Sequence, residues 1–427
     1  MSLSQRNLSV FLAAASPILV ILIPASPVQA GSYLLSAHGD SANGVSRTST
    51  AALGYAQGNC AHCHEPHASI QGSEPAPADG SPSSFLLFTT PFTNQSTSLC
   101  FDCHVDTGSR QTGGAITNRS YAYRAGGWTS DTLNDVKESF AFTSPGSSHN
   151  LSDIQTFIAS QSWGYAADAN PCVACHNPHA AQGDPENAPN AAKSSTTRGW
   201  LISRPSQHGN NPWPLWGDDA SERMNSYTSA YQAPYRFGST TAYEPDGSTT
   251  QDGANLTDFV TFCTDCHNAT NTIYSTNLGR NLRQIDWANE KHGLGSADEY
   301  IDMLPPYTAG SGSLGYVLSC LDCHEPHGSS NPYLLRQEVN GGALAGAITT
   351  TTGSTFRYLC ERCHDNTTNT WEAIHHFTND RAYARRACST CHGGYPQDCS
   401  RCHYHGAITG SGGVNQTDYS PTNRRTF

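Results

Sequence analysis

The segment CLDCHEPH at residues 320–327 has the pattern C-x-x-C-H-x-P-H, and this pattern decides how the chain is organised. It occurs twice more, at residues 60–67 and 172–179. Each copy has an isolated histidine upstream, an aromatic-aliphatic triplet downstream and then a second C-x-x-C-H motif. Self-similarity of this kind indicates a fold built from repeated units.

All sixteen cysteines of the 427-residue chain lie in eight C-x-x-C-H motifs. The two thiols of such a motif can hold a haem covalently, and the adjoining histidine can ligate its iron. A disulfide scaffold would not need a histidine after every second cysteine, and zinc sites combine two half-sites. The sequence therefore predicts eight covalently bound haem c groups. Their attachment residues would be Cys60, Cys63, Cys100, Cys103, Cys172, Cys175, Cys263, Cys266, Cys320, Cys323, Cys360, Cys363, Cys388, Cys391, Cys399 and Cys402.

Each motif also contains one proximal histidine. These are His64, His104, His176, His267, His324, His364, His392 and His403. The C-x-x-C-H-x-P-H copies contain a second histidine, which we call the following histidine: His67, His179 and His327. It cannot bind the same iron as the proximal histidine, because the haem plane would separate them on so short a segment. Since the proline between them fixes φ and limits the turn, we predict that the following histidine ligates the partner haem of its own unit.

The remaining histidines provide candidate distal ligands. Of the nineteen histidines, eight are proximal, and His62, which lies between two cysteines of one motif, is interpreted as a bystander. The repeat assigns six distal ligands, the upstream and the following histidines: His38, His149, His292, His67, His179 and His327. His405 and His376 complete the predicted set, with His375 and His208 as alternatives. Methionine is too scarce to serve generally, so bis-histidine ligation is predicted at all eight irons.

The spacing of the motifs predicts a domain order. In units 1 and 3 the two motifs begin 40 residues apart, whereas in unit 2 they begin 91 residues apart, so unit 2 carries an insertion. The predicted order is a signal peptide at 1–30, unit 1 at 31–140, unit 2 at 141–285 with the insertion at about 181–255, unit 3 at 286–370, a terminal haem pair at 371–405 and a polar C-terminal tail at 406–427.

Composition and repeats together predict the fold class. Gly, Ser, Thr, Asn and Pro are spread throughout, and few windows show apolar residues at helical spacing. We expect a mostly irregular structure with short helices and few strands, and helices near Asp298–Met303 and Glu372–Ala387. The mature chain has only about 50 residues for each haem. We therefore expect a haem-cored protein built from three doubled-CXXCH repeats plus a terminal haem pair.

Residues 1–30 have the features of a secretory signal, with Arg6 before an apolar run and a small-residue cleavage site that ends at Ala30. No later stretch is apolar enough to span a bilayer, so we predict an exported chain with no transmembrane segment after cleavage. Extracellular or cell-surface placement is favoured over the periplasm. Without residues 1–30 the chain has 22 basic and 35 acidic residues, a net charge of −13. This acidic balance argues against a nucleic-acid partner.

The pattern resembles the doubled-CXXCH family of multihaem c-type cytochromes over most of residues 35–405, and the haem count and ligand layout resemble its extracellular, filament-forming members. The resemblance implies an electron carrier rather than an enzyme. Its partners would be redox proteins or extracellular acceptors such as metal oxides or electrode-like surfaces. Self-polymerisation is a further expectation, with His38 ligating a neighbour's haem. The alternative is an octahaem oxidoreductase of the nitrite, hydroxylamine or tetrathionate type, often marked by C-x-x-C-K, which this sequence lacks.

Overall fold

The computed structural model describes residues 33–34, 36–42, 44–65, 83, 85–105, 136–163, 165–181, 205–207, 231–232, 259–287, 292, 304, 317–318, 320–340, 342–349, 355–364 and 405. The chain divides into two parts, Met1–Ala30 and Gly31–Phe427, and every described residue belongs to the second. The division falls at the predicted cleavage site, while the signal peptide itself stays a prediction. Within the described residues, no helix has the length and apolar character needed to cross a membrane.

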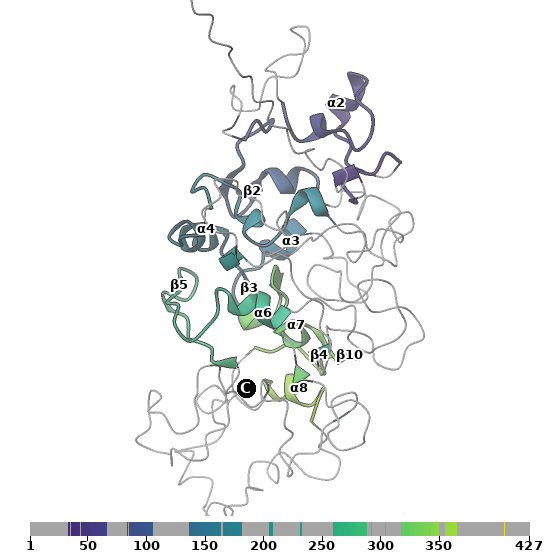
Figure 1. Cartoon of the computed structure of the whole chain (residues 1–427). Coiled ribbons are helices and arrows are strands. Elements are labelled where there is room, and N and C mark those ends of the chain that lie inside the picture. Colours follow the sequence, from purple (N-terminus) through teal and green to yellow (C-terminus); the bar gives the residue numbers. More distant parts are fainter. Residues whose placement is uncertain are drawn as a thin grey trace, which may run out of the picture. The chain divides into compact units, whose positions relative to one another are not determined.

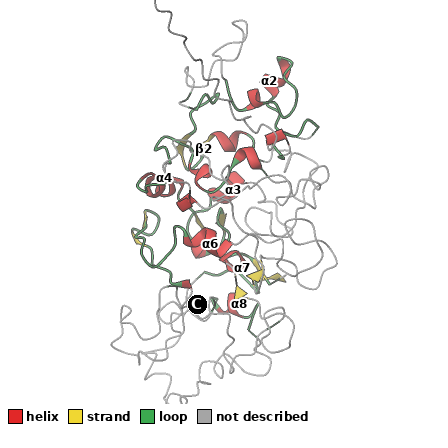
Figure 2. Cartoon of the chain, in the orientation of Figure 1, coloured by secondary structure: helices red, strands yellow, loops and turns green. Residues whose placement is uncertain are grey.

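Short elements joined by loops and turns make up the described chain (Figures 1 and 2). The α-helices are α2 (Thr48–Ala52), α3 (Val136–Phe140), α4 (Leu151–Ala159), α6 (Phe259–Thr264), α7 (Cys320–Cys323) and α8 (Arg357–Cys360). The 3-10 turns are η1 (Cys60–His62), η2 (Leu99–Asp102), η5 (Pro171–Ala174), η6 (Pro178–Ala180), η7 (Pro205–Gln207) and η10 (Pro332–Leu334). The predicted irregular fold class, with short helices and few strands, is confirmed for this part of the chain.

The described strands form pairs only. They are β1 (Phe92–Asn94), β2 (Thr97–Ser98), β3 (Ser147–Ser148), β4 (Tyr231–Gln232), β5 (Tyr274–Ser275), β6 (Arg280–Asn281), β7 (Val317–Leu318), β8 (Gly328–Ser329), β9 (Glu338–Val339) and β10 (Gly342–Ala343). The pairs β1–β2, β5–β6 and β9–β10 are local and antiparallel, and β4–β7 is parallel. No larger sheet organises the described residues.

Two strand pairs, β4–β7 and β3–β8, join segments of different units, and both join unit 2 to unit 3. The antiparallel pair β3–β8 sets Ser147 of unit 2 opposite Ser329 of unit 3. An equivalent contact joins units 1 and 2, where the N–H of Ala37 donates to the carbonyl of Ala181 at 2.7 Å. In both β3–β8 and this contact, the residues just before an upstream histidine (His38 or His149) pair with residues of the next unit. Those residues come just after its following histidine (His179 or His327). These contacts determine which histidines meet.

Helix α4 is the longest described helix, and the sequence analysis did not predict it. It begins after Asn150, whose side chain accepts a hydrogen bond from the backbone N–H of Asp153 at 3.0 Å. Asparagine is favoured at this capping position. Leu151 and Ile158, seven residues apart and therefore on one helix face, are both buried. The signal, an N-cap residue followed by apolar residues at helical spacing, is present in the sequence.

Apolar side chains gather in three small clusters rather than in one core. The clusters are Ile158, Tyr165, Ala169 and Ala174; Leu335, Val339, Ile348, Phe356 and Leu359; and Phe101, Phe140 and Leu151. Motif cysteines pack against the first two clusters, Cys266 against one and Cys323, Cys360 and Cys363 against the other. The apolar packing in the described residues thus lies beside the C-x-x-C-H motifs.

Some predicted features lie outside the described residues. They are the helices near Asp298–Met303 and Glu372–Ala387, both motifs of the terminal haem pair, and the C-terminal tail. The boundaries of the units and the count of repeats likewise remain predictions.

Candidate haem sites

Each described C-x-x-C-H motif folds into one tight turn. In every case the N–H of the histidine donates to the carbonyl of the first cysteine, at 2.8–2.9 Å. Two of the turns are capped by asparagine. The side chain of Asn59 accepts from the N–H of Ala61 at 2.9 Å, and that of Asn170 accepts from the N–H of Cys172 at 2.8 Å. The turn keeps two thiols and one imidazole on a single short segment, as attachment of one haem requires.

The aromatic-aliphatic triplets position the first histidine of their unit. The Nδ1 of His64 lies 3.2 Å from the carbonyl oxygen of Phe85, and the Nδ1 of His324 lies 2.9 Å from that of Tyr333. An isolated β-bridge also joins each histidine to its triplet. Because a carbonyl only accepts, Nδ1 carries the hydrogen and Nε2 remains to ligate iron. The triplet of unit 2, residues 200–202, lies outside the described residues.

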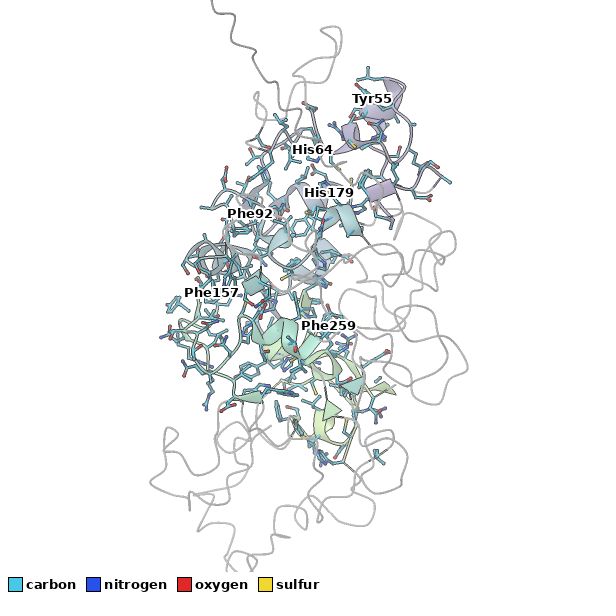
Figure 3. The ribbon with its side chains drawn as sticks, viewed as in Figure 1. Tyr55, His64, Phe92, Phe157, His179 and Phe259 are labelled. Atoms are coloured by element: carbon cyan, nitrogen blue, oxygen red, sulfur yellow. The ribbon has the colours of Figure 1, made fainter. Side chains whose placement is uncertain are left out.

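Every described proximal histidine faces the ring of one other histidine. The pairs are His64–His179, His104–His38, His176–His327, His267–His149, His324–His405 and His364–His292. Their ring centroids lie 5.9–6.4 Å apart. Two imidazoles bonded to opposite sides of one metal ion, each at about 2 Å, have ring centres about 6 Å apart. These residues therefore fit a haem iron, and Figure 3 shows one pair, His64 and His179, close together.

The pairing of the following histidines differs from the prediction. His179 of unit 2 faces His64 of unit 1, and His327 of unit 3 faces His176 of unit 2. Each following histidine thus meets the first proximal histidine of the preceding unit, not a partner in its own unit. The physical reason is the backbone pairing between units, β3–β8 and its equivalent at Ala37, which holds these segments against the unit before.

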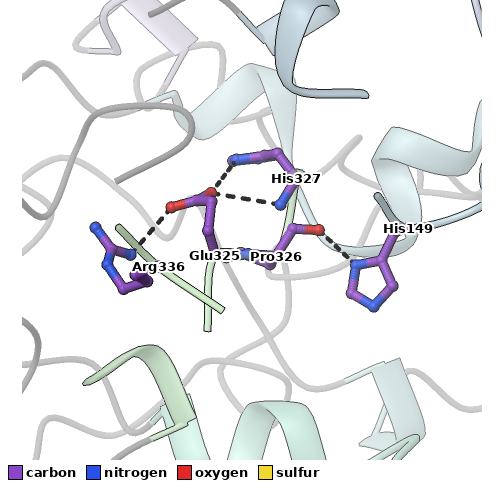
Figure 4. Close-up of polar contacts among 5 residues, drawn as sticks. All are labelled: His149, Glu325, Pro326, His327 and Arg336. Atoms are coloured by element: carbon purple, nitrogen blue, oxygen red, sulfur yellow. Dashed lines mark hydrogen bonds and ion pairs between the residues drawn. The ribbon is translucent and has the colours of Figure 1, made fainter. Parts of the chain in front are cut away.

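Two upstream histidines are oriented by hydrogen bonds from Nδ1. The Nδ1 of His38 lies 2.9 Å from the carbonyl oxygen of Pro178, and the Nδ1 of His149 bonds the carbonyl oxygen of Pro326 (Figure 4). Both acceptors are the proline of C-x-x-C-H-x-P-H in the next unit. This proline therefore has a second effect besides limiting the turn, because its carbonyl fixes the tautomer of a candidate ligand in the preceding unit.

Aromatic side chains pack against two distal candidates, His179 and His405, and the sequence analysis did not identify these aromatic residues. The ring of Tyr33 lies edge-on to that of His179, with centroids 5.7 Å apart. The ring of Trp287 lies 6.2 Å from that of His405. Tyr33 and Trp287 each stand five residues before an upstream histidine. That shared spacing is a sequence signal that could have identified both.

His62 is engaged in a different way. Its Nδ1 accepts the backbone N–H of Arg47 at 2.9 Å, and its Nε2 lies 3.0 Å from the carbonyl oxygen of Ala56. Both ring nitrogens are therefore used within the chain. This arrangement agrees with the interpretation of His62 as a bystander.

Burial favours the neutral state of several facing rings, which is the state that binds metal. Burial, together with a smaller effect of neighbouring imidazoles, lowers the pKa of His176 and His267 to about 3 and that of His324 to about 4. Burial changes the pKa of two motif thiols in the opposite direction. Burial raises the pKa of Cys63 to about 12 and that of Cys175 to about 11, so neither is a thiolate at neutral pH. None of the described cysteines forms a disulfide.

The described motifs lie beside one another in sequence order. Thiols of successive motifs interact in five pairs: Cys63 with Cys103, Cys100 with Cys172, Cys175 with Cys266, Cys263 with Cys320, and Cys323 with Cys363. The two thiols of each pair are close enough for one to shift the pKa of the other. The six described motifs therefore form an uninterrupted row, an order that the sequence had left open.

Glu325, between the two histidines of its motif, is a buried carboxylate that bonds a candidate ligand, His327. Burial opposes its ionisation, but the hydrogen bond from His327 and the charge of Arg336 outweigh this effect. The pKa of the Glu325 carboxyl therefore lies below its usual range. The side chain is ionised at neutral pH.

The remaining predicted site residues lie outside the described residues. They are the proximal histidines His392 and His403, the distal candidates His67, His208, His375 and His376, and the four cysteines Cys388, Cys391, Cys399 and Cys402.

Comparison with known protein families gives one finding. A family model described as "Doubled CXXCH motif" matches residues 316–344, which include the first motif of unit 3 and its triplet. The match supports a multihaem c-type cytochrome. Motifs of this kind hold haem c covalently, and the doubled arrangement suggests electron transfer. No curated protein and no solved structure matches the chain.

Proposed function

We propose that this chain is an exported octahaem c-type cytochrome that passes electrons along a row of bis-histidine haems to acceptors outside the cell. Bound haem provides one-electron redox chemistry. The protein positions each haem and sets its environment through axial ligands, hydrogen bonds and burial. The observation that carries the proposal is the proximity of successive motifs in sequence order, whose thiols shift one another's pKa. A conduit needs such a row, whereas catalysis on a substrate needs one open iron.

The facing histidines favour a carrier over an oxidoreductase. At each of the six described proximal histidines, a second ring occupies the side where a substrate would have to bind. An iron held between two such rings can change its redox state but has no coordination position left for a substrate. The residues around it then act on potential and solvent access alone.

Haem counting and spin state test this function. The secreted protein should contain eight haems per chain, and the ferric form should give only low-spin EPR signals. Carbon monoxide should leave the spectrum of the reduced protein unchanged. A high-spin fraction near one haem in eight, together with carbon monoxide binding and turnover of nitrite or hydroxylamine, would instead indicate the oxidoreductase.

The described pairs share a one-unit offset, and extending this offset to the outermost units suggests a ligand contact between copies. His67 is the following histidine of unit 1, and the sequence contains no C-x-x-C-H motif before that unit. His405, which follows the last motif, already faces His324 of unit 3. By the rule of units 1 to 3, the first proximal histidine of the terminal pair, His392, would face a following histidine of another unit. We infer that a second copy provides it, so that His67 of one copy ligates the haem of His392 in another.

Such a contact joins different surfaces of two copies, and repetition without closure produces a filament. It gives His67 the role that the sequence analysis gave to His38, whose ring faces His104 of its own unit. Electron microscopy of the secreted protein should show fibres. His67→Ala should abolish them and leave about one haem in eight high-spin, whereas the control Gln207→Ala, at an exposed residue outside the ligand set, should keep both fibres and spectrum. A wild-type monomer at high concentration with eight low-spin haems would contradict the inference.

A further inference from the structure

Glu325 lies within a buried polar cluster beside one facing pair (Figure 4). Its side chain is 4% exposed and that of Arg336 is 2% exposed. The Nδ1–H of His327 donates to Oε1 of Glu325 at 2.8 Å, and Nη1 of Arg336 lies 3.0 Å from Oε2. The ring of His327 faces that of His176 at 6.0 Å with the planes 12° apart. The carboxylate therefore bonds one nitrogen of an imidazole whose Nε2 remains to ligate iron.

Other distal candidates have neutral acceptors at the same nitrogen. His38 and His149 donate to the backbone carbonyls of Pro178 and Pro326. A carboxylate attracts the Nδ1 hydrogen more strongly than a carbonyl does, because the hydrogen bond is charge-assisted. It thereby makes the imidazole a more basic ligand. A more basic ligand and a nearby negative charge both stabilise ferric over ferrous iron, and so lower the reduction potential.

The equivalent position in unit 2 has no such charge. Asn177 stands where unit 3 has Glu325, and its Oδ1 accepts the backbone N–H of His179 at 3.0 Å. His179 faces His64 in the same register in which His327 faces its partner. Both haem sites have a buried glutamate nearby, Glu65 directly after His64 and Glu325 two residues before His327, but only Glu325 bonds the Nδ1 of a facing histidine, while Glu65 pairs with Arg47.

We propose that Glu325 is a positioning residue that gives the haem between His176 and His327 a lower reduction potential than the haem between His64 and His179. This inference rests on the haem ligation proposed above. Arg336 holds the carboxylate in place and offsets part of its charge. The result is a step in potential between equivalent haems of neighbouring units, so electrons favour the one in unit 1.

The substitution Glu325→Gln tests this step, since glutamine keeps the shape and an acceptor oxygen but removes the charge. In a redox titration followed by EPR, one low-spin component should become about tenfold easier to reduce, a rise of about 60 mV for one electron. Its g values should also move, because the ligand loses anionic character. Glu325→Asp, which restores the charge, should return the component toward the wild-type value. Asp153→Asn, at a partly exposed carboxylate outside every C-x-x-C-H motif that accepts the backbone N–H of Thr276 at 2.7 Å, controls for loss of one charge and should move no component.

Two further variants separate the possible failures. His327→Ala should leave about one haem in eight high-spin; if all haems remain low-spin, the proposed ligation is wrong. If His327→Ala has that effect but Glu325→Gln moves no component, ligation stands and the tuning role is overturned. Should Glu325→Gln yield no folded holoprotein, Asn177→Glu tests the same effect in reverse. One component should then become about tenfold harder to reduce, and an unchanged titration would equally overturn the proposal.

Discussion

Replacing His179 by alanine should open a coordination position on the first haem of unit 1, although His179 belongs to unit 2. Its ring faces that of His64 at 6.0 Å and is held edge-on by Tyr33 at 5.7 Å. The variant removes one distal ligand out of eight and leaves the proximal histidine in place. About one eighth of the ferric iron should therefore change from low-spin to high-spin. Added imidazole should reverse the change, since alanine leaves room for it.

EPR of the ferric protein measures this fraction, and a second substitution locates it. Cys60→Ser with Cys63→Ser removes the first haem of unit 1, and in that background His179→Ala should create no new high-spin iron. The matched background, Cys263→Ser with Cys266→Ser, removes the own-unit partner and should preserve the effect. If the effect instead survives without the haem of unit 1 and vanishes without the partner haem, the pairing between units is refuted.

Three stability predictions follow from local geometry. Leu86, 47% exposed, has φ 57°, so Leu86→Gly should stabilise the fold by about 0.5–1 kcal/mol, seen as a higher thermal midpoint. Asn170→Ala removes the cap on Cys172 from a buried site and should cost about 2 kcal/mol in denaturant titrations; an unchanged midpoint would show the cap to be dispensable. A Cβ on Gly328 would collide with the Ser139 carbonyl, so Gly328→Ala should cost about 1–3 kcal/mol and raise the high-spin fraction by loosening β3–β8.

The sequence predicted the local chemistry because covalent motifs are short-range features. Five residues beginning at Cys320 contain both thiols and the proximal histidine, and one turn brings them together whatever surrounds it. The irregular fold class was predictable for a related reason. A chain rich in glycine, proline and small polar residues has few apolar stretches at helical or strand spacing, and α4 is the exception that a closer search for capping residues would have found.

The pairing between units was not predictable from spacing. The proline turn between His176 and His179 would allow His179 to reach a haem of its own unit or a haem of the preceding unit. The residues of this turn are compatible with both pairings and do not select one. The choice is made by contacts such as β3–β8, in which two residues of one unit pair with two of the next. Pairs this short leave no alternating pattern in the sequence, so only the folded chain reveals them.

The one-unit offset also implies that the haem sites of this chain are completed in order from the N-terminus. Residues 115 positions apart form the pair His64–His179, and 151 positions separate His176 from His327. Under the export proposed above, the chain emerges from its N-terminus and its earlier segments fold first. The haem of each first motif would then have an open axial position until the next unit folds and its following histidine binds the iron. The distal histidine can bind this haem only after the next unit has folded. The order of the histidines therefore makes completion of each of these haem sites depend on folding of the unit that follows it.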